Sequence, residues 1–251
     1  TKPRFCEEIN KWWMCDEGRY IFQEYAGKDR LTKAQIDGAD ASLDEAIAYA
    51  GKKLEGMSGD EVIVLLSARL STETMFAVKK LADQLGGAQV FGTGRPNWDD
   101  DEVLKSADRN PNSAGLRLVF GEELGSPEDL EQRLSSGTVK VAICLDEKTT
   151  NPESLTDVGT VIGLAHRSAG FAKKAQVVLP LAAWCEIDGS FVNKDGRVGR
   201  FHPAVEAPGD AQPGWVLVER ISEACGQALE LGDSAHDVYA AASGALGEES
   251  L

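Results

Sequence analysis

The stretch EVIVLLS, residues 61–67, decides the fold of this chain. Its apolar residues are consecutive rather than alternating, and they are β-branched residues or leucine. A strand that is buried on both faces requires this composition, whereas a strand with one wet face alternates apolar and polar residues. We therefore expect residues 61–67 to form a central strand of a parallel sheet.

A helix is predicted directly after this strand, over residues 71–85. Met75, Val78, Leu81 and Leu85 recur at the three- and four-residue spacing of one helix face. Two glycines follow and are typical of a helix end. A buried strand followed by an amphipathic helix is the unit from which α/β sheets are built.

Helices and strands alternate through most of the chain. Ser42 and Glu45 form a capping box that begins a helix ending near residue 56, and Ser126 with Pro127 begins another that ends near residue 134. Apolar runs predict four more strands, over residues 89–91, 139–145, 160–165 and 176–179. The alternation predicts a doubly wound, mostly parallel, Rossmann-like α/β sheet.

The remaining segments carry weaker patterns. Residues 92–125 are rich in Gly, Pro, Asn and Asp, and we expect a short helix around Val103 and a strand over residues 116–120. After Pro180 the chain is polar and turn-rich up to an amphipathic helix over residues 215–229. The C-terminal residues are expected to fray.

Composition excludes several classes of function. The 251 residues include 41 acidic and 26 basic side chains, giving a net charge of −15 that repels nucleic acid and anionic membranes. No run of 18 apolar residues and no apolar leader are present, so we expect a cytosolic location. Five cysteines, an odd number, indicate reduced thiols. Because the chain begins with Thr1, we expect a processed chain or a split gene product.

Common cofactor motifs are weak or absent. Gly92 and Gly94 follow a strand without a Walker lysine or a third glycine, so a structural turn is favoured over a phosphate loop. The three histidines lack the spacing of a zinc site, and His166, at a strand end, is interpreted as a polar surface residue rather than a ligand. The acidic run at residues 99–101 is more typical of a solvated loop than of a cation site.

The stretch NKWWMCDEGRY, residues 10–20, is the strongest candidate site. Cys15 is followed by Gly18, which allows close backbone approach, and by Arg19, whose charge favours a thiolate. Trp12 and Trp13 would exclude water from a redox centre. The alternative is a hydrophobic plug around an inert, buried cysteine, and the residues alone do not decide between the two.

Two stretches resemble a known family. PRFCEEINKWWMCDEGRY, residues 3–20, resembles the end of the iron–sulfur module in molybdopterin-oxidoreductase-like proteins, most closely the large iron–sulfur subunit of NADH:quinone oxidoreductase (complex I). Cys15 lies on the cysteine of the family's W-x-C-D-x-G-R-[FY] motif. KKAQVVLPLAAWCEIDGSFVNKDGRVGRF, residues 173–201, is similar to a second signature of the family, from which Gln176, Ser190 and Asp195 depart mildly.

The resemblance implies a role in electron transfer. Cys15 would ligate a 4Fe–4S cluster, with Trp13, Gly18 and Arg19 beside it, but only with three ligands from outside this chain, because a four-iron cluster needs four. No residue matches a molybdenum ligand, so bound molybdopterin is not expected. Residues 1–35 would end the iron–sulfur module, residues 36–180 would form the Rossmann-like domain, and residues 181–251 would carry the signature loop, a helix and the tail.

The resemblance also implies partners and leaves alternatives. The chain would be a scaffold without a complete active site, bound to iron–sulfur and flavin subunits of a peripheral arm on the cytoplasmic side of the inner membrane. The same module could belong to a molybdopterin-dependent formate dehydrogenase or an NAD-linked hydrogenase. A third possibility, from another class, is a non-redox interaction domain whose Trp12 and Trp13 dock onto a partner.

Overall fold

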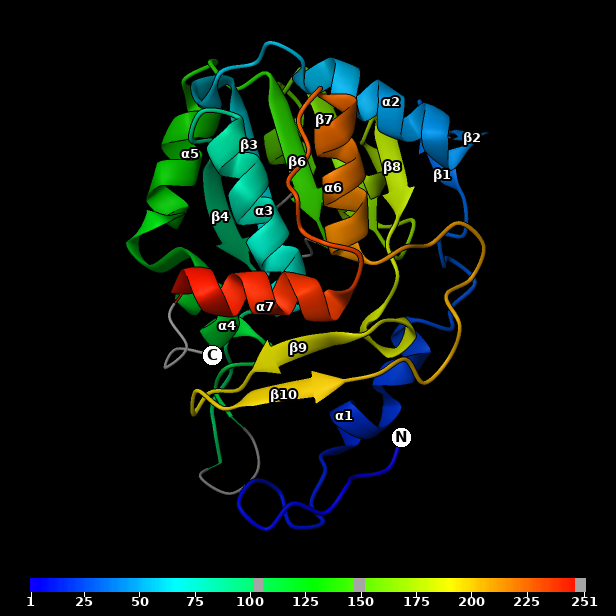
Figure 1. Ribbon diagram of the computed structural model, residues 1–251, viewed down its shortest axis with the longest axis vertical. Coiled ribbons are helices and arrows are strands. Elements are labelled where there is room, and N and C mark those ends of the chain that lie inside the picture. The colour runs from blue at the N-terminus through cyan, green and yellow to red at the C-terminus, as the bar shows by residue number, and fades with distance from the viewer. Residues whose placement is uncertain (102–105, 147–151, 247–251) are drawn as a thin grey trace.

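An eight-stranded sheet forms the centre of the molecule in the computed structural model, which describes residues 1–101, 106–146 and 152–246 (Figure 1). The strand order is β2-β1-β8-β7-β6-β3-β4-β5. The strands from β8 to β5 are parallel, and β1 and β2 form an antiparallel edge. The predicted doubly wound, mostly parallel sheet is confirmed; the antiparallel edge was not foreseen.

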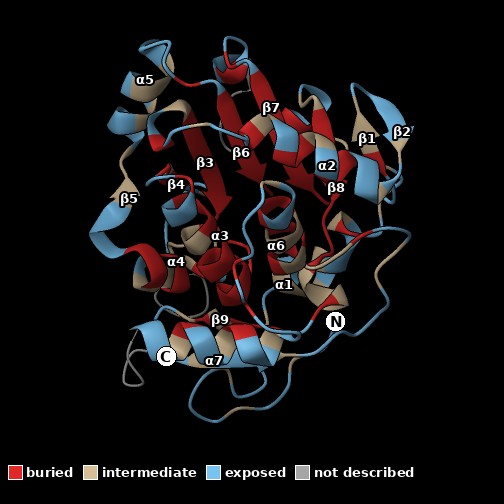
Figure 2. Cartoon of the chain, turned by 45° about the horizontal axis from the view of Figure 1, so that its top comes forward, coloured by how far each residue is buried: buried red, intermediate tan, exposed pale blue. Residues whose placement is uncertain are grey.

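The predicted strands lie in the middle of this sheet. β3 (Val62–Ser67) pairs with both β4 (Gln89–Thr93) and β6 (Val141–Leu145), and all six of its residues are buried. β7 (Thr160–Ala165) and β8 (Val177–Pro180) continue the sheet on the β6 side. The short strands are β1 (Ala34–Ile36), β2 (Ala39–Ala41) and β5 (Leu124–Gly125). Figure 2 shows the central strands as almost wholly buried.

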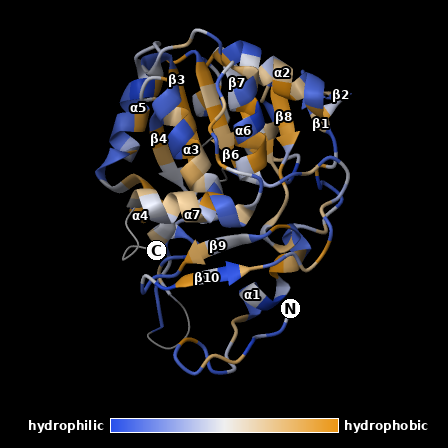
Figure 3. Cartoon of the chain, viewed as in Figure 1, coloured by the Kyte–Doolittle hydropathy of each residue, from blue (hydrophilic) through white to orange (hydrophobic). Residues whose placement is uncertain are grey.

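Alternate residues of the central strands pack into two apolar layers, one on each face of the sheet. Val62, Val64 and Leu66 pack with α2 (Leu43–Leu54), α3 (Thr72–Gln84) and α6 (Gly214–Ala224), which lie in front of the sheet in Figure 1. Ile63 and Leu65 pack on the other face with residues of α5 (Pro127–Ser135) and of the 3₁₀ turns η4 (Pro152–Leu155) and η5 (Gly170–Lys173). Figure 3 shows the strands as the apolar centre between these two layers.

Local capping explains where the main helices begin. The Ser42 hydroxyl accepts a hydrogen bond from the backbone N–H of Glu45, and the Glu45 carboxylate accepts one from the backbone N–H of Ser42. These two bonds complete the predicted capping box. Ser126 and Asp129 repeat the arrangement at α5, with Pro127 at the first helical position as expected.

Two predictions in the weaker segments are wrong. Residues 116–120 belong to a helix, α4 (Ser113–Phe120), because Leu116, Val119 and Phe120 pack at helical spacing against the α3 layer. The C-terminal segment does not fray over its described part, where α7 (Ala235–Leu246) buries Val238 and Ala242 completely; residues 247–251 lie outside the described residues. The helix expected over residues 215–229 ends earlier, at Ala224, and the one expected around Val103 lies outside the described residues.

The segment after Pro180 contains regular structure. The short turn η6 (Trp184–Glu186) precedes a hairpin made of β9 (Gly189–Val192) and β10 (Val198–Phe201). In Figure 1 this hairpin lies below the sheet, and the N-terminal α1 (Asp16–Tyr20) lies beneath it. A second 3₁₀ turn, η1 (Ile21–Glu24), leads from α1 toward the sheet, while η2 (Gly59–Glu61) and η3 (Gly121–Glu123) are connecting turns.

The topology of the sheet predicts that a ligand would bind at the edge formed by the carboxyl ends of its strands. The chain runs outward from β3 to β5 in one direction and from β6 to β8 in the other, so β3 and β6 flank the point where the order reverses. Ligands of open α/β sheets bind at the carboxyl ends of the strands beside such a point. Of the helices in the part of the chain that the structure describes, none has the length and apolarity to cross a membrane.

Candidate functional site

A cavity of about 750 Å³ lies between the N-terminal segment and the carboxyl edge of the sheet. Cys15 and Gly18 line it from α1 and the residue before it, and Arg69 and Arg95 line it from the segments that follow β3 and β4. Trp184 of η6 contributes to the wall as well. The cavity therefore joins the sequence-predicted cysteine to the sheet edge at which the topology predicts a ligand.

Cys15 is an exposed thiol, and the structure contradicts the alternative of a buried cysteine in a hydrophobic plug. Its Sγ accepts the backbone N–H of Gly18 at 3.3 Å. A Cβ placed on Gly18 would lie 3.5 Å from this sulfur, so glycine keeps one side of the thiol free of side-chain atoms. The structure thus brings together two of the four predicted site residues.

The other two predicted residues are near in sequence but do not line the cavity. Trp13 is 65% exposed, and Arg19 lies 3.8 Å from the exposed carboxylate of Asp16. Trp12, also exposed, stacks against Phe5 with ring centroids 5.0 Å apart. Within the single chain these indoles therefore do not shield Cys15 from water.

Arginines on the cavity wall were missed by sequence reasoning. Arg69 Nη2 donates to Glu24 Oε2 and to the Tyr25 hydroxyl, both at 2.8 Å, and Arg95 also pairs with Glu24. Burial raises the pKa of Tyr25 to about 12, although Arg69 opposes this shift. A buried guanidinium that holds a carboxylate and a phenol fixes the N-terminal segment on the sheet edge.

Three hydrogen-bond donors on this wall have no partner among the described residues: Arg69 Nη1, Arg109 Nε and Trp184 Nε1. Arg109 stacks over Trp98, with its guanidinium carbon 4.2 Å from the ring centroid. Buried donors are almost always satisfied, so an unsatisfied group in a folded protein calls for an explanation. The three residues line the cavity, but the three unpaired nitrogens themselves are shielded from solvent.

His166 is buried, and the prediction of a surface histidine is wrong. His166 is 2% exposed. Its Nδ1 lies 2.7 Å from Asp146 Oδ1, and the centroid of its ring lies 4.9 Å from that of the Tyr25 ring. Asp146 follows β6 and His166 follows β7, so both stand at the carboxyl edge. Hydrogen bonds therefore link Glu24, Arg69 and Tyr25, and the Tyr25 ring packs against His166.

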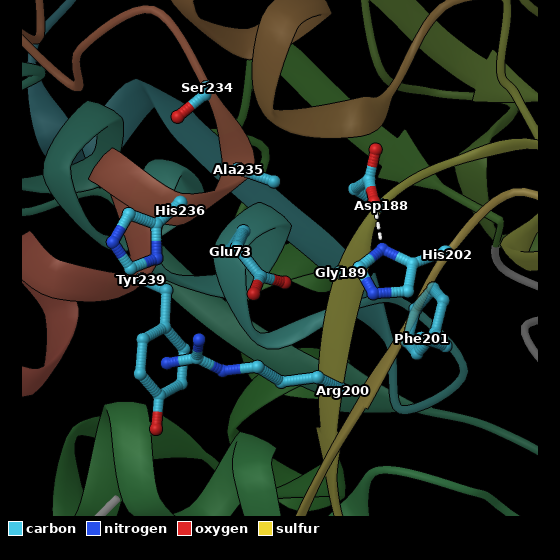
Figure 4. Close-up of a pocket in the computed structure, with 10 residues that line it drawn as sticks. All are labelled: Glu73, Asp188, Gly189, Arg200, Phe201, His202, Ser234, Ala235, His236 and Tyr239. Carbon is cyan, nitrogen blue, oxygen red and sulfur yellow. Dashed lines mark hydrogen bonds and ion pairs between the residues drawn. The ribbon is translucent and has the colours of Figure 1, made fainter.

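A second, smaller cavity of about 310 Å³ lies beside the β9–β10 hairpin (Figure 4). Glu73 of α3 is 2% exposed there and accepts the Ser190 backbone N–H at 3.0 Å and its hydroxyl at 2.8 Å. Burial raises the pKa of Glu73, and the bonds from Ser190 oppose the shift only in part. His202 lies on the rim with Asp188, at 2.6 Å, and is largely exposed. The two bonds between Ser190 and Glu73 hold the hairpin against α3.

The weaker candidate sites, at Gly92, Gly94 and residues 99–101, are explained by structure rather than by ligand binding. A Cβ on Gly92 would lie 2.7 Å from Leu116, and one on Gly94 would lie 2.6 Å from Asn110, so packing accounts for both glycines. Residues 99–101 are exposed. Within the described residues, no three His, Cys, Asp or Glu side chains gather as a metal site.

Comparisons with known proteins identify relatives for most of the chain. The molybdopterin oxidoreductase family model matches residues 122–224. An NADH-quinone oxidoreductase subunit of Salmonella typhimurium is 26% identical over 193 residues, which are 74% of this chain and 20% of that protein. The F420-dependent formate dehydrogenase 2 subunit alpha of Methanococcus maripaludis is 46% identical over 69 residues, 27% of this chain and 10% of that one.

A solved structure supports the fold alone. The formyltransferase/hydrolase complex from Methylorubrum extorquens contains a chain that matches with a TM-score of 0.52 at 12% identity, covering 75% of this chain and 97% of that one. The matched segment spans only a tenth to a fifth of the two curated relatives named above. Residues 122–224 therefore match the molybdopterin oxidoreductase family model, and 74% of the chain is similar to an NADH-quinone oxidoreductase subunit, in agreement with the family that the sequence motifs resemble.

Proposed function

We propose that this chain is an electron-transfer scaffold in the peripheral arm of an NADH-quinone oxidoreductase-type assembly and supplies Cys15 as one ligand of a 4Fe–4S cluster. The observation that carries the proposal is the exposed Cys15 thiol at the wall of the 750 Å³ cavity. When bound, the cluster would supply one-electron transfer. The other three ligands would come from outside this chain, because such a cluster needs four.

The surroundings of Cys15 fit an inorganic cluster. The Gly18 N–H already donates to the sulfur, and hydrogen bonds to cysteine sulfur are among the features that set the potential of iron–sulfur centres. The open side at Gly18 leaves room for a group larger than a thiol proton. Trp13, which is exposed, and Arg19, which is partly buried, would be covered by the iron–sulfur module that completes the site.

Replacement of Cys15 tests the assignment. Cys15→Ala should remove one cluster signal from the electron paramagnetic resonance spectrum of the assembly purified through this chain, because a cluster with three ligands is lost or converted. Cys225→Ala is the control, since Cys225 is a half-buried thiol at the end of α6 whose Sγ donates to the Gly51 carbonyl. An unchanged spectrum for Cys15→Ala would sink the proposal.

A second candidate function is favoured by the size of the cavity. A volume of about 750 Å³ lined by Arg69, Arg95 and Arg109 suits a large anionic cofactor, and the formate dehydrogenase relative shares 46% identity over 69 residues. The chain would then be part of a molybdopterin-dependent enzyme, such as a formate dehydrogenase or an NAD-linked hydrogenase.

Elemental analysis of the native assembly separates these functions. Iron without molybdenum supports the electron-transfer scaffold. Its partners would then be iron–sulfur and flavin subunits, and it would lie on the cytoplasmic side of the membrane. Molybdenum together with iron supports the second candidate. The absence of both metals would leave a non-redox interaction domain, in which the exposed Trp12 and Trp13 contact a partner.

A further inference from the structure

Arg95 and Arg109 are both held in place on the wall of the 750 Å³ cavity. Arg95 follows β4, and Arg109 lies shortly before α4. The Asn110 side chain fixes the backbone of Arg95, since its Oδ1 accepts the Arg95 N–H at 2.7 Å and its Nδ2 donates to the Arg95 carbonyl at 3.0 Å. The Arg109 guanidinium stacks over Trp98, 4.2 Å from the ring centroid. Both cations are therefore positioned before any ligand arrives.

The Glu17 carboxylate lies between these two arginines. Its Oε2 is 3.9 Å from Arg95 Nη1, and its Oε1 is 3.7 Å from Arg109 Nη2. Both separations are longer than a hydrogen bond, and the Glu17 side chain is 51% exposed. Ion pairs of this kind contribute little to stability, because water and salt screen them. Glu17 also belongs to α1, which has no buried residue, so its carboxylate can move away at little cost.

Glu24 also pairs with Arg95, but this second carboxylate is fixed. Its Oε2 accepts from Arg69 at 2.8 Å, and the side chain of Arg69 is only 4% exposed. The next residue, Tyr25, is buried, and its hydroxyl accepts from the same arginine. Of these two carboxylates, Glu17 is therefore the exchangeable one, whereas Glu24 belongs to the frame of the cavity.

The other walls of the cavity are mostly aromatic and apolar. Trp98, Trp184 and Phe191 line it together with Met14 and Ile21. Cavities of several hundred cubic ångströms bind small molecules, and aromatic side chains favour a flat ring system. Guanidinium groups bind phosphate in a bidentate manner, and a phosphate carries more charge and more acceptor oxygens than a carboxylate. These walls and cations together suit an aromatic molecule that bears a phosphate group.

We propose that Glu17 is a built-in competitor for such a ligand, because its carboxylate occupies the place that the phosphate would take between Arg95 and Arg109. Binding then requires α1 to withdraw Glu17, which makes the N-terminal segment a gate on the cavity. The inference rests on the second candidate function, an anionic ligand in this cavity, and deepens it by naming the residue that controls access. It requires no cluster at Cys15.

Isothermal titration calorimetry of the purified chain with AMP tests this gate, and adenosine is the matched probe without a phosphate. Glu17→Gln removes the competing charge and should tighten AMP binding by roughly three- to tenfold, the range expected for two exposed ion pairs. Glu7→Gln is the control: Glu7 is exposed on the same segment and does not line the cavity, and its replacement changes the net charge equally. Arg109→Gln in the Glu17→Gln background should remove the gain.

Thermal unfolding of each variant checks that it is folded. Tighter binding of AMP but not of adenosine by Glu17→Gln, with Glu7→Gln equal to the parent, supports the inference. Equal AMP affinities of Glu17→Gln and the parent, no AMP binding by either, or an equal gain for adenosine would overturn it. The second candidate function fails separately, if the native assembly contains no molybdenum, and the AMP titrations do not depend on that metal.

Discussion

Arg30 and Glu186 form a buried ion pair that ties the N-terminal segment to the carboxyl ends of β7 and β8. Arg30 Nη2 lies 2.5 Å from Glu186 Oε2, and both side chains are less than a tenth exposed. Arg30 Nη1 also donates to the carbonyl oxygens of His166, at 2.9 Å, and Leu181, at 3.0 Å. Glu186 lies in the signature stretch of residues 173–201. Its ion pair with Arg30 gives it a structural role, which is to position the wall of the cavity.

Glu73 makes stability depend on pH in an unusual direction for a carboxylate. Because burial raises its folded pKa above the ordinary 4.5, the folded protein holds this proton more tightly than the unfolded chain. The resulting stabilisation is fully present below pH 4.5 and is lost as the pH rises through the folded pKa. At higher pH, therefore, the raised pKa of Glu73 lowers the stability of the fold.

Glu73→Gln should stabilise the protein at pH 8 relative to the parent, and this advantage should shrink toward pH 4.5. The amide keeps one acceptor and one donor for Ser190, so the hairpin contact is retained. Urea unfolding at a series of pH values measures the effect. Glu128→Gln, at an exposed glutamate in the first turn of α5, is the control, and a pH-independent difference for Glu73→Gln would contradict the expectation.

The β9–β10 hairpin and α7 are docked elements whose stability comes from α3 and its neighbours. Asn112, fully buried, donates to the Leu70 carbonyl at 2.8 Å and accepts the Val192 N–H at 2.7 Å, so it bridges the sheet edge to the hairpin. α7 packs across α3 and β9. In Figure 1 it crosses the lower end of α3, above the hairpin.

Val238→Asp should release α7 from the body of the molecule. The valine is fully buried, and burial of its side chain contributes about 1.5–3 kcal/mol, which a charged residue would forfeit along with a desolvation cost. Limited proteolysis should then cut the chain near residues 230–246 well before the sheet unfolds. Ala240→Asp, on the exposed face of the same helix, should leave the cleavage pattern of the parent; equal cleavage in both variants would argue against docking through Val238.

The whole molecule is one sheet between two apolar layers, with polar appendages at its carboxyl edge. β3, β6 and β7 are covered on both faces and paired on both sides. β2 is an edge strand with mostly exposed residues, and the segment before Cys15 contains several exposed aromatic residues. Local stability should therefore fall from the centre of the sheet toward β2 and the N-terminus.

Hydrogen exchange of backbone amides should follow this gradient. We expect the slowest exchange in β3, β6 and β7, approaching the global unfolding free energy, and exchange within seconds to minutes for residues 1–13. Mass spectrometry of peptides from each segment measures both limits. Protection of residues 1–13 equal to that of β3 in the isolated chain would show that the N-terminal segment is part of the core rather than an appendage.

Much of the sheet and its helices was predictable because the signals are local. A continuous apolar run marks a strand covered on both faces, and the caps at Ser42 and Ser126 satisfy N–H groups three residues away. α4 was mistaken for a strand because a short apolar run fits either structure until its packing partners are known. α7 was missed because its few apolar residues become informative only once α3 offers a surface.

The sequence by itself determined the α/β class, the central strands and the capped helices, and it singled out Cys15 as a predicted site residue, since each depends on neighbouring residues or on a contiguous motif. Only the tertiary structure decided what surrounds Cys15. Arg30 meets Glu186 across 156 residues, and Arg69 meets Glu24 across 45. Burial of His166, the cavity and its unsatisfied donors likewise arise from segments that the sheet topology brings to one edge, and contacts across such separations leave no local pattern in the chain.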